Sequence, residues 1–490
     1  MDDVEVFGLL ATVVAVGVLL AVVTARASQH LRVPAPAIFL VGAAIASDVI
    51  PGLNAFTITG VQRVVTVALV FILFDGGMHL GWDKVRKEAG AIVWVGIAGT
   101  AVTAAAMAAL AHFLFGFEWA TALLLGTALS PTDPAVVFSV LGNREITGRS
   151  GVILEGESGA NDPVGIALMA ALLSAGSIEG WGGVASVGST FLGQMIIGGA
   201  IGVAGGLGLR WVMVNVQLPG QGLYAIRTLA AALALYGVAT VAHGSGFLAV
   251  FIAGILVGDT RSPLKSEIKS FHSALSSLGE IVAFTLLGLT VHVGSLGDRN
   301  AWQIGLVLAL LLGLIVRPLL VGLVLTPLTM ARGERIFVLI TGLKGAVPIL
   351  LGTYILETGQ NDGARLYNII LVVVTVSVIL QGSAVPTLAR ICRVPMRGVD
   401  QEPWAAGLRL RAEPQHLQRL EVAPGSAADG ASPELIVASG QVWVCLVSRD
   451  GKLVDLRTKP TLQPGDRVLV QGHQHSEVRV RELFGGSNAQ

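Results

Sequence analysis

The sequence contains few charged residues. Asp, Glu, Lys and Arg make up 13% of its 490 residues, whereas 53% are hydrophobic. Soluble domains carry about 25% charged residues, so this composition predicts a chain that is embedded in a membrane over most of its length. The 32 basic residues balance the 32 acidic ones, and the charge therefore indicates no nucleic-acid partner.

The sequence also contains little cysteine, and it has no basic segment ahead of its first apolar run. Two cysteines, Cys392 and Cys445, are too few for a disulfide framework. The chain begins with the acidic segment 1–5, MDDVE, ahead of its first apolar run. A signal peptide has a basic segment at this place, so we expect no cleaved leader.

Apolar stretches long enough to cross a bilayer recur as far as residue 391. A spanning helix needs roughly 17–25 apolar residues, which predicts an all-α polytopic membrane protein with about 13 transmembrane helices. The predicted spans are 4–25, 35–50, 61–79, 90–114, 119–141, 150–174, 190–213, 225–242, 245–258, 273–293, 301–325, 335–356 and 366–389. Arg and Lys gather in alternate loops, beginning after the first span. The positive-inside rule then places the N-terminus outside and the C-terminus in the cytoplasm, and we expect the cell (inner) membrane.

Segment 155–163, with the sequence EGESGANDP, is strongly polar although both of its flanks are apolar. On a helix, the spacing places Glu157, Ser158, Asn161 and Asp162 on one side. An ionisable residue inside a bilayer costs a few kcal/mol, so it generally faces a cavity and serves a function. The sixth span is therefore predicted to carry a functional site.

Segment 130–134, with the sequence SPTDP, is a second polar cluster in the preceding span. Its two prolines remove backbone donors and disturb the helix, which leaves carbonyl and carboxylate oxygens free to hold a cation. Segments 130–134 and 155–163 together predict an ion-binding site in the middle of the membrane.

Two basic residues, Arg317 and Lys344, lie outside the loops, in apolar surroundings beside Gly or Pro. The spans of Asp133 and Lys344 are the fifth and the twelfth, which are corresponding positions in two halves of the membrane region. Interrupted spans at corresponding positions are typical of transporters that are built from inverted repeats and bind their substrate near the midplane.

Four segments resemble, in order, the motifs of a known family: 74–77 (FDGG), 132–134 (TDP), 157–163 (ESGANDP) and 342–346 (GLKGA). This set resembles the NhaP-type cation:proton antiporters of the monovalent cation:proton antiporter-1 family, over residues 4–391. The resemblance implies an NhaA-like fold of inverted repeats with crossed broken helices, a homodimer and elevator-type alternating access. It implies exchange of Na⁺ or K⁺ for H⁺ without a cofactor, by a transporter that is not an enzyme.

The resemblance also assigns roles to single residues. Asp162 is implied to bind the monovalent cation and the proton in competition, and Asp133, Thr132 and Ser158 to help coordinate the cation. Asn161 stands where an electrogenic relative has a second Asp, which implies electroneutral exchange of one cation for one proton.

Glu157 is implied to form a buried ion pair with Lys344, the basic residue of motif 342–346. That residue is often Arg in the family, and a buried Lys loses its charge more readily than Arg does. Asp75 stands where the family has Glu, so we expect its accessory gating role to be weaker. We expect Arg317 to compensate helix C-terminal dipoles where the broken helices meet.

The composition changes after Arg390. We expect a membrane domain at 1–394, a proline-containing linker at 395–415, a small cytoplasmic α+β or β-rich domain at 416–484, and a disordered end at 485–490. Turn signals such as Asp-Gly separate runs that are typical of strands, namely 435–438, 442–447, 452–456 and 467–471.

Within this second domain, segments 448–452 and 462–470 are similar to the C-terminal half of potassium-uptake and potassium-channel regulatory domains, known as TrkA-C or RCK-C. The similarity implies a regulatory domain that binds a small-molecule or ion effector. It favours K⁺ as the cation, although the ion-site residues themselves do not separate Na⁺ from K⁺ because both ions take the same oxygen ligands.

Two other functions share some of these features. Ser158 and His243 imitate the Ser–His dyad of rhomboid intramembrane proteases, in which His243 would activate Ser158. A protease would leave Asp133, Asp162 and Lys344 without a role. A cation channel is the other alternative, but the sequence contains no filter loop such as TVGYG.

Overall fold

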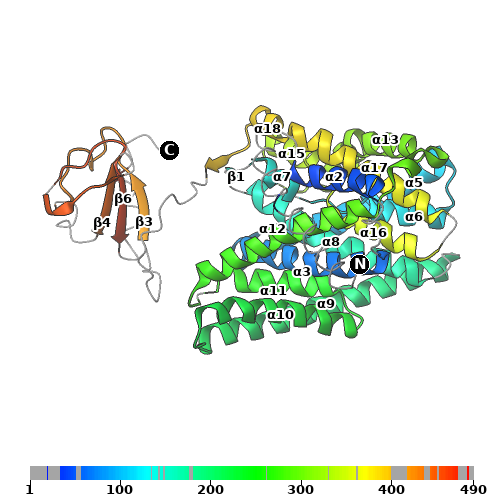
Figure 1. Cartoon of the computed structure of the whole chain (residues 1–490), viewed down its shortest axis with the longest axis horizontal. Coiled ribbons are helices and arrows are strands. Elements are labelled where there is room, and N and C mark those ends of the chain that lie inside the picture. The colour runs from blue at the N-terminus through cyan, green and yellow to red at the C-terminus, as the bar shows by residue number, and fades with distance from the viewer. Residues whose placement is uncertain are drawn as a thin grey trace. The chain divides into compact units, whose positions relative to one another are not determined.

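The computed structural model of the protein forms two compact units, Met1–Pro403 and Trp404–Gln490 (Figure 1). The residues described are 19, 34–50, 57–133, 135–141, 144–146, 149–175, 180–260, 262–328, 330–359, 362–398, 417–434, 442–449, 452–458, 460–472, 483 and 484.

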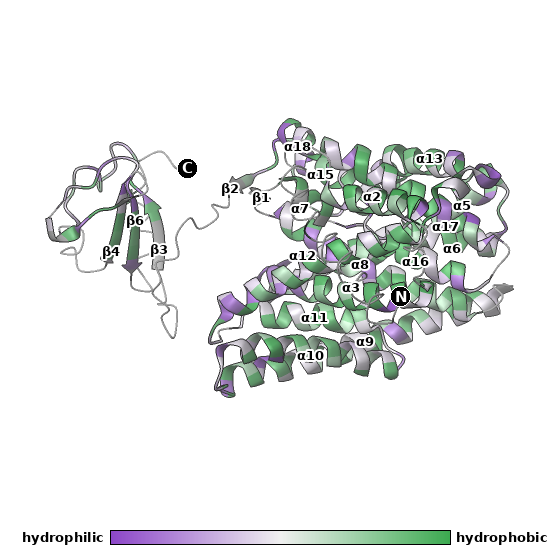
Figure 2. Cartoon of the chain, in the orientation of Figure 1, coloured by the Kyte–Doolittle hydropathy of each residue, from purple (hydrophilic) through white to green (hydrophobic). Residues whose placement is uncertain are grey.

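The first unit consists mainly of apolar helices (Figure 2). Seven helical stretches among the described residues are long and apolar enough to cross a bilayer, and shorter apolar helices accompany them. The predicted all-α membrane architecture is therefore confirmed. The first predicted span, 4–25, lies outside the described residues except for Leu19.

The described helices follow one another with short connections. They are α2 (Ala35–Val49), α3 (Ile58–Leu80), α4 (Trp82–Trp94), α5 (Thr100–Phe115), α6 (Trp119–Ala128), α7 (Ala135–Leu141), α8 (Arg149–Ser174), α9 (Gly180–Asn215), α10 (Gln221–Val241), α11 (Gly246–Gly258), α12 (Lys265–Leu289), α13 (Ala301–Leu311), α14 (Gly322–Val324), α15 (Arg332–Ile340), α16 (Ala346–Glu357), α17 (Gly363–Val376) and α18 (Gly382–Ile391). A 3₁₀ segment, η3 (Val293–Asn300), precedes α13.

Wide π-helical turns continue some of these helices without a break. They are η2 (Val95–Gly99) between α4 and α5, η4 (Leu312–Val321) between α13 and α14, and η5 (Ser377–Gln381) between α17 and α18. Such turns occur frequently at functional sites, and η4 contains Arg317.

The helices pack in two groups. Helices α2, α3 and α9 to α12 pack mainly on one another, and α4 to α8 together with α13 to α18 form the second group. Small residues allow close approach within the first group: a Cβ atom on Gly77 of α3 would lie 2.5 Å from the carbonyl oxygen of Phe251 in α11. Contacts of α8 with α9 and α11, and of α16 with α3 and α12, join the groups.

The two interrupted spans meet in the second group. Helix α6 ends at Ala128 and α7 begins at Ala135, while α15 ends at Ile340 and α16 begins at Ala346. The backbone N–H of Asp133 donates a hydrogen bond of 2.8 Å to the carbonyl oxygen of Leu343. The predicted interruptions are therefore real, and they touch through their backbones.

A short antiparallel ribbon closes the membrane unit at the end of α18. Strand β1 (Arg144–Ile146) lies between α7 and α8 and pairs with β2 (Met396–Gly398), with Ile146 opposite Met396. Ile146 is buried, and its carbonyl oxygen lies against Gly151 of α8. The predicted linker thus begins with a strand of the membrane unit, and its remainder, 399–415, lies outside the described residues.

The second unit contains an antiparallel sheet in the order β3-β6-β4-β5. Its strands are β3 (Leu417–Glu421), β4 (Val442–Arg449), β5 (Lys452–Leu453) and β6 (Arg467–Gly472). Buried Val447, Val468 and Val470 belong to its apolar core. The predicted strands at 442–447 and 467–471 are confirmed, while 435–438 lies outside the described residues.

Two strands of this sheet differ from the prediction. The predicted strand 452–456 is cut short because a 3₁₀ turn, η6 (Leu456–Thr458), follows β5. Strand β3 was not predicted, since its sequence LQRLE contains no β-branched or aromatic residue. The likeness of this unit to TrkA-C domains stays a prediction, and residues 485–490 lie outside the described part of the chain.

A buried acid links the turn before β6 to β4. Both oxygens of Asp466 accept hydrogen bonds of 2.8 Å from the guanidinium of Arg449, and Oδ2 also accepts one of 2.8 Å from the N–H of Gln463. The Arg449 guanidinium, together with the Gln463 N–H, holds the pKa of the Asp466 carboxyl below its usual value.

We expect Asp466→Asn to destabilise this sheet by about 1–3 kcal/mol at pH 7, because a charge-assisted pair is lost. A carboxylate with a lowered pKa contributes stability above its unfolded pKa of about 3.9 and loses it as pH falls through the folded pKa. The hydrogen-exchange rates of the β4 and β6 amides, corrected for intrinsic rates, should therefore become similar in the wild type and in Asp466→Asn as the pH falls towards about 3. Glu421→Gln, at an exposed position on β3, is the control. A difference in exchange rate between wild type and Asp466→Asn that persists at low pH would contradict this account.

Candidate functional site

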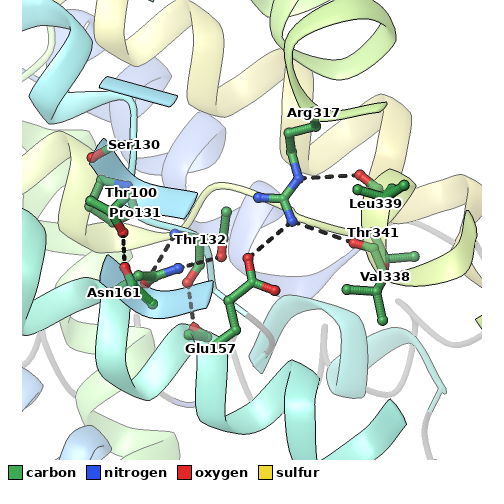
Figure 3. Close-up of polar contacts among 12 residues, drawn as sticks. Thr100, Ser130, Pro131, Thr132, Glu157, Asn161, Arg317, Val338, Leu339 and Thr341 are labelled. Carbon is green, nitrogen blue, oxygen red and sulfur yellow. Dashed lines mark hydrogen bonds and ion pairs between the residues drawn. The ribbon is translucent and has the colours of Figure 1, made fainter. Parts of the chain in front are cut away.

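The polar residues of α8 are buried on one side of the helix, as the spacing predicts. The exposed fractions are 4% for Glu157, 3% for Ser158, 3% for Asn161 and 8% for Asp162. This side of α8 faces the interruption between α6 and α7, where Thr132 lies (Figure 3).

Two side chains of α8 hold Thr132. The hydroxyl of Ser158 donates to the carbonyl oxygen of Thr132. The amide of Asn161 donates to Thr132 Oγ1 at 2.7 Å and accepts from the Thr132 N–H at 3.3 Å. Both polar groups of Asn161 thus contact Thr132, and this residue positions the interrupted helix; its part in binding the cation stays a prediction.

Asp162 is a buried acid of the site for which the described residues provide no counter-ion. Its Oδ1 is buried and has no hydrogen-bond partner among the described residues. A buried acceptor without a partner costs on the order of 1–3 kcal/mol, and more when it is charged. Its position therefore suits a carboxylate that exchanges a proton for an external cation.

Asp133 lies near Asp162, close enough for their charges to interact. It also lies directly against Gly345, at the start of α16, where a Cβ atom would overlap the carboxylate. A carboxylate at a helix N-terminus is favoured by the helix dipole. The glycine of motif 342–346 thus leaves room for the acid of the other interrupted span.

Lys344 is fully buried, and its side chain binds backbone carbonyls at the end of α6. Its ammonium group donates to the carbonyl oxygens of Ser130 at 3.1 Å and Pro131 at 2.9 Å. These carbonyls follow the C-terminus of α6, which carries a partial negative charge and has no further helical donors. Lys344 therefore stabilises the interruption of the fifth span.

Arg317 binds backbone carbonyls at the end of α15 in the same way (Figure 3). Its Nε donates to the carbonyl oxygen of Leu339 at 3.2 Å, and its Nη2 to that of Val338 at 3.4 Å. The predicted position of Arg317 at a helix C-terminus is present in the structure. Gly342 makes the approach possible, because a Cβ atom there would overlap the guanidinium.

The buried ion pair differs from the predicted one. Glu157 pairs with Arg317, at 3.3 Å between Oε1 and Nη2, and not with Lys344. The physical reason is that the Lys344 ammonium is turned towards the carbonyls of Ser130 and Pro131. A planar guanidinium, by contrast, can serve a carboxylate and helix carbonyls together.

Asp75, the predicted accessory residue, lies on α3. It accepts a hydrogen bond of 3.2 Å from Ser273 of α12 and lies 3.3 Å from Nδ1 of His79. These contacts lie within the first group of helices. The sequence assigns no role to Glu280 of α12, whose Oε1 is buried without a hydrogen-bond partner among the described residues, although an acid within an apolar span generally serves a function.

The structure does not assemble the Ser–His pair of a protease. Ser158 donates to the Thr132 carbonyl, and His243 lies exposed in the turn after α10. Among the described residues no hydrogen bond joins Ser158 to His243, so the condition for an activated nucleophile is not met.

Comparison with known proteins now identifies the family. The sequence pattern of the sodium/hydrogen exchanger transmembrane family matches residues 15–391. The chain belongs to the sodium/hydrogen exchanger family. The predicted membership among cation:proton antiporters is thereby confirmed.

Relatives and a solved structure agree with this family. The K⁺/H⁺ antiporter NhaP of Alkalimonas amylolytica is 34% identical over 77% of this chain and 66% of that relative. The K⁺/H⁺ antiporter NhaP2 of Shewanella sp. strain MR-4 is 33% identical over 99% of this chain and 84% of that relative. The sodium/proton antiporter MjNhaP1 of Methanocaldococcus jannaschii matches with a TM-score of 0.65 and 20% identity, over 78% of this chain and all of that one. The fold of this exchanger is thus the predicted NhaA-like fold.

We expect a double-mutant cycle to show that Arg317 is the partner of Glu157. Breaking a buried pair costs about 3–5 kcal/mol, because one charge is left without its partner. Arg317→Met should therefore lower thermal stability in detergent strongly, and Glu157→Gln in the same chain should restore much of the loss. The matched cycle of Glu157→Gln with Lys344→Met should show the smaller coupling. Equal coupling in both cycles would contradict the observed pair.

Proposed function

We propose that this exchanger moves K⁺ or Na⁺ in one direction and H⁺ in the other, in an electroneutral cycle driven by an elevator movement. Membership of the family supports monovalent cation:proton antiport. The observation that carries the site assignment is the buried, unpartnered Oδ1 of Asp162 beside the crossing of the interrupted spans.

Competition at Asp162 would couple the two fluxes. A cation bound at the carboxylates of Asp162 and Asp133 favours their charged forms, and a proton on Asp162 removes the charge that attracts the cation. One site then carries either ion but not both. This competition links uptake of one ion to release of the other without a second binding site or a cofactor.

A count of charges in the crossing supports electroneutral exchange. Among the described residues of the crossing, the carboxylates of Asp133, Glu157 and Asp162 accompany two buried cations, Arg317 and Lys344. When all five are ionised, one negative charge remains, and one monovalent cation or one proton neutralises it. The loaded site is then uncharged in both halves of the cycle, which minimises the cost of moving it through the bilayer.

The packing of the helices in two groups supports an elevator movement. The ion-site residues lie in the group of α4 to α8 and α13 to α18, and contacts within each group dominate those between the groups. The first group would serve as the scaffold and as the contact between two copies in a homodimer. We assign the exchanger to the cell (inner) membrane, with the N-terminus outside and the C-terminal unit in the cytoplasm, as the distribution of basic loops favours.

Two observations favour K⁺ over Na⁺ as the transported cation. Both named bacterial relatives are K⁺/H⁺ antiporters, and the second unit resembles potassium-regulatory domains. We therefore propose K⁺ as the main cation. Reconstitution into proteoliposomes with K⁺, Na⁺ and Li⁺ in turn tests this choice and separates an antiporter from a channel.

We expect Asp162→Asn to abolish exchange while the protein stays folded, because the amide can neither bind a proton nor attract a cation. Asp133→Asn should mainly raise the half-saturating cation concentration. Proton movement driven by a K⁺ gradient in proteoliposomes measures both. Asp362→Asn, in a surface ion pair with Arg299, is the matched control, and normal exchange by Asp162→Asn would sink the assignment.

Electroneutral exchange makes a separate prediction. A K⁺ jump should start proton movement without generating a membrane potential, and an imposed potential should leave the rate unchanged. A potential-sensitive dye and a pH-sensitive dye in the same vesicles, with leaks blocked, report both quantities. A potential that grows with the antiport rate would show that more than one charge moves per cycle.

We further propose that the second unit regulates exchange through the β1–β2 ribbon. Strand β2 precedes this unit in the chain, and β1 directly connects α7, which follows Asp133, to α8, which carries Asp162. An effector bound to the second unit could therefore bias the ion-binding helices without touching the site. A coupling free energy of about 1–3 kcal/mol is typical of such links.

Removal of residues 404–490 should leave an active exchanger whose half-saturating cation concentration is shifted severalfold and whose preference between K⁺ and Na⁺ is unchanged. Removal from residue 394 onwards also deletes β2, and we expect it to shift the half-saturating cation concentration further. Activity against K⁺ concentration at fixed pH, with equal reconstituted amounts, compares these proteins with the full chain. Three superimposable curves would reject regulation by this route.

A further inference from the structure

Ser377 binds a backbone group of the second interrupted span. It is the first residue of η5, the π-helical turn between α17 and α18, and its side chain is buried. Its Oγ accepts a hydrogen bond of 3.2 Å from the backbone N–H of Lys344. Lys344 lies between α15 and α16, so its N–H has no helical partner there. Inside a bilayer another protein group must then satisfy this N–H, and the Ser377 hydroxyl does so.

The peptide group that Ser377 holds is also the one that contacts Asp133. The bond between Leu343 and Lys344 carries the carbonyl of the first residue and the N–H of the second. The carbonyl oxygen accepts the hydrogen bond of 2.8 Å from the Asp133 N–H, and the N–H donates to Ser377. Because a peptide group is planar, a rotation that breaks one of these bonds also misaligns the other. Ser377 therefore fixes the orientation of the carbonyl that holds Asp133.

Gln381 in turn orients the Ser377 hydroxyl. Ser377 Oγ donates a hydrogen bond of 2.6 Å to Gln381 Oε1, at the other end of η5. A hydroxyl has one hydrogen to donate, so its lone pairs are left to accept from Lys344. Gly313 of η4 leaves room for the Gln381 amide, because a Cβ atom there would lie 2.7 Å from Nε2. The π turns η4, through Arg317, and η5, through Ser377, thus both hold the second interruption.

Each interrupted span is held by the helix that follows it in the chain. Helix α8 follows α7, and its Ser158 binds the carbonyl of Thr132, next to Asp133. Helix α17 follows α16 and continues into η5, whose Ser377 binds the N–H of Lys344. A buried serine thus secures the backbone of each interruption.

We propose that Ser377 and Gln381 are positioning residues of the cation site. This inference rests on the proposed antiport, in which Asp133 helps to bind the cation. The two residues act through the peptide between Leu343 and Lys344, whose carbonyl holds Asp133 in place. The same anchor fixes the backbone of Lys344, whose ammonium group binds the carbonyls at the end of α6. Loss of the anchor therefore weakens binding of the cation and leaves the movement of the loaded site intact.

The first test is Ser377→Ala in the full-length exchanger in proteoliposomes. We expect the half-saturating K⁺ concentration to rise about three- to tenfold, the size of one lost hydrogen bond, with the maximal rate within about twofold of wild type. Ser377→Thr keeps the hydroxyl and should restore the wild-type value. Ser383→Ala is the matched control, because the Ser383 hydroxyl donates to the Ile379 carbonyl of its own helical segment. An unchanged half-saturating concentration in Ser377→Ala would overturn the proposal.

A double-mutant cycle tests whether the two residues act as one unit. Gln381→Leu should raise the half-saturating K⁺ concentration, but it should add nothing in the Ser377→Ala background, where the hydroxyl is already absent. Effects that multiply would contradict the relay. If Ser377→Ala does not fold, Gln381→Leu decides alone, since it leaves Ser377 in place; a wild-type half-saturating concentration in this variant would overturn the proposal.

Hydrogen exchange tests the anchor without an assay of transport. The amides of segment 341–346 should exchange faster in Ser377→Ala than in wild type or in Ser383→Ala, and equal rates would overturn the anchor. A wild-type protein that exchanges no cation would overturn the proposed antiport and with it the role at the cation site. Normal transport by wild type, with Ser377→Ala indistinguishable from it, would overturn the positioning role alone.

Discussion

Two helix C-termini end inside the membrane, and the rest of the site depends on how their carbonyl groups are satisfied. A bilayer supplies no water to backbone groups, so an interrupted helix is tolerated only where protein partners replace it. Here Lys344 donates hydrogen bonds to the carbonyls that follow α6, and Arg317 donates hydrogen bonds to those at the end of α15. Each interruption has its own buried cation, as expected for two halves of one inverted repeat.

Buried cations in turn require buried anions, and this requirement explains the composition of α8. Glu157 forms an ion pair with Arg317, and Asp162 lies close enough to Lys344 for their charges to interact. Ser158 and Asn161 form hydrogen bonds with Thr132, and these bonds hold the interruption in place. Asp162, whose buried Oδ1 has no hydrogen-bond partner among the described residues, is then left for the ion chemistry.

Much of this arrangement follows from the sequence, because polar residues in apolar spans are few and their spacing is informative. The motifs around Asp133, Asp162 and Lys344 predict two interruptions that meet, and they do. The partner of Glu157 could not be predicted, since the choice between Arg317 and Lys344 depends on where each side chain points in three dimensions. Strand β3 carries no local strand signal and is defined only by pairing with β6.

The ribbon of β1 and β2 is made of three residues on each strand. A two-stranded ribbon of this length is not stable by itself in water, so it persists only while α8 and α18 hold its ends near each other. Its hydrogen bonds join main-chain groups, and any extended segment of another molecule could take the place of either strand. The contact that ties the end of the membrane unit to α8 thus depends on the helices that flank the ribbon, and not on the ribbon alone.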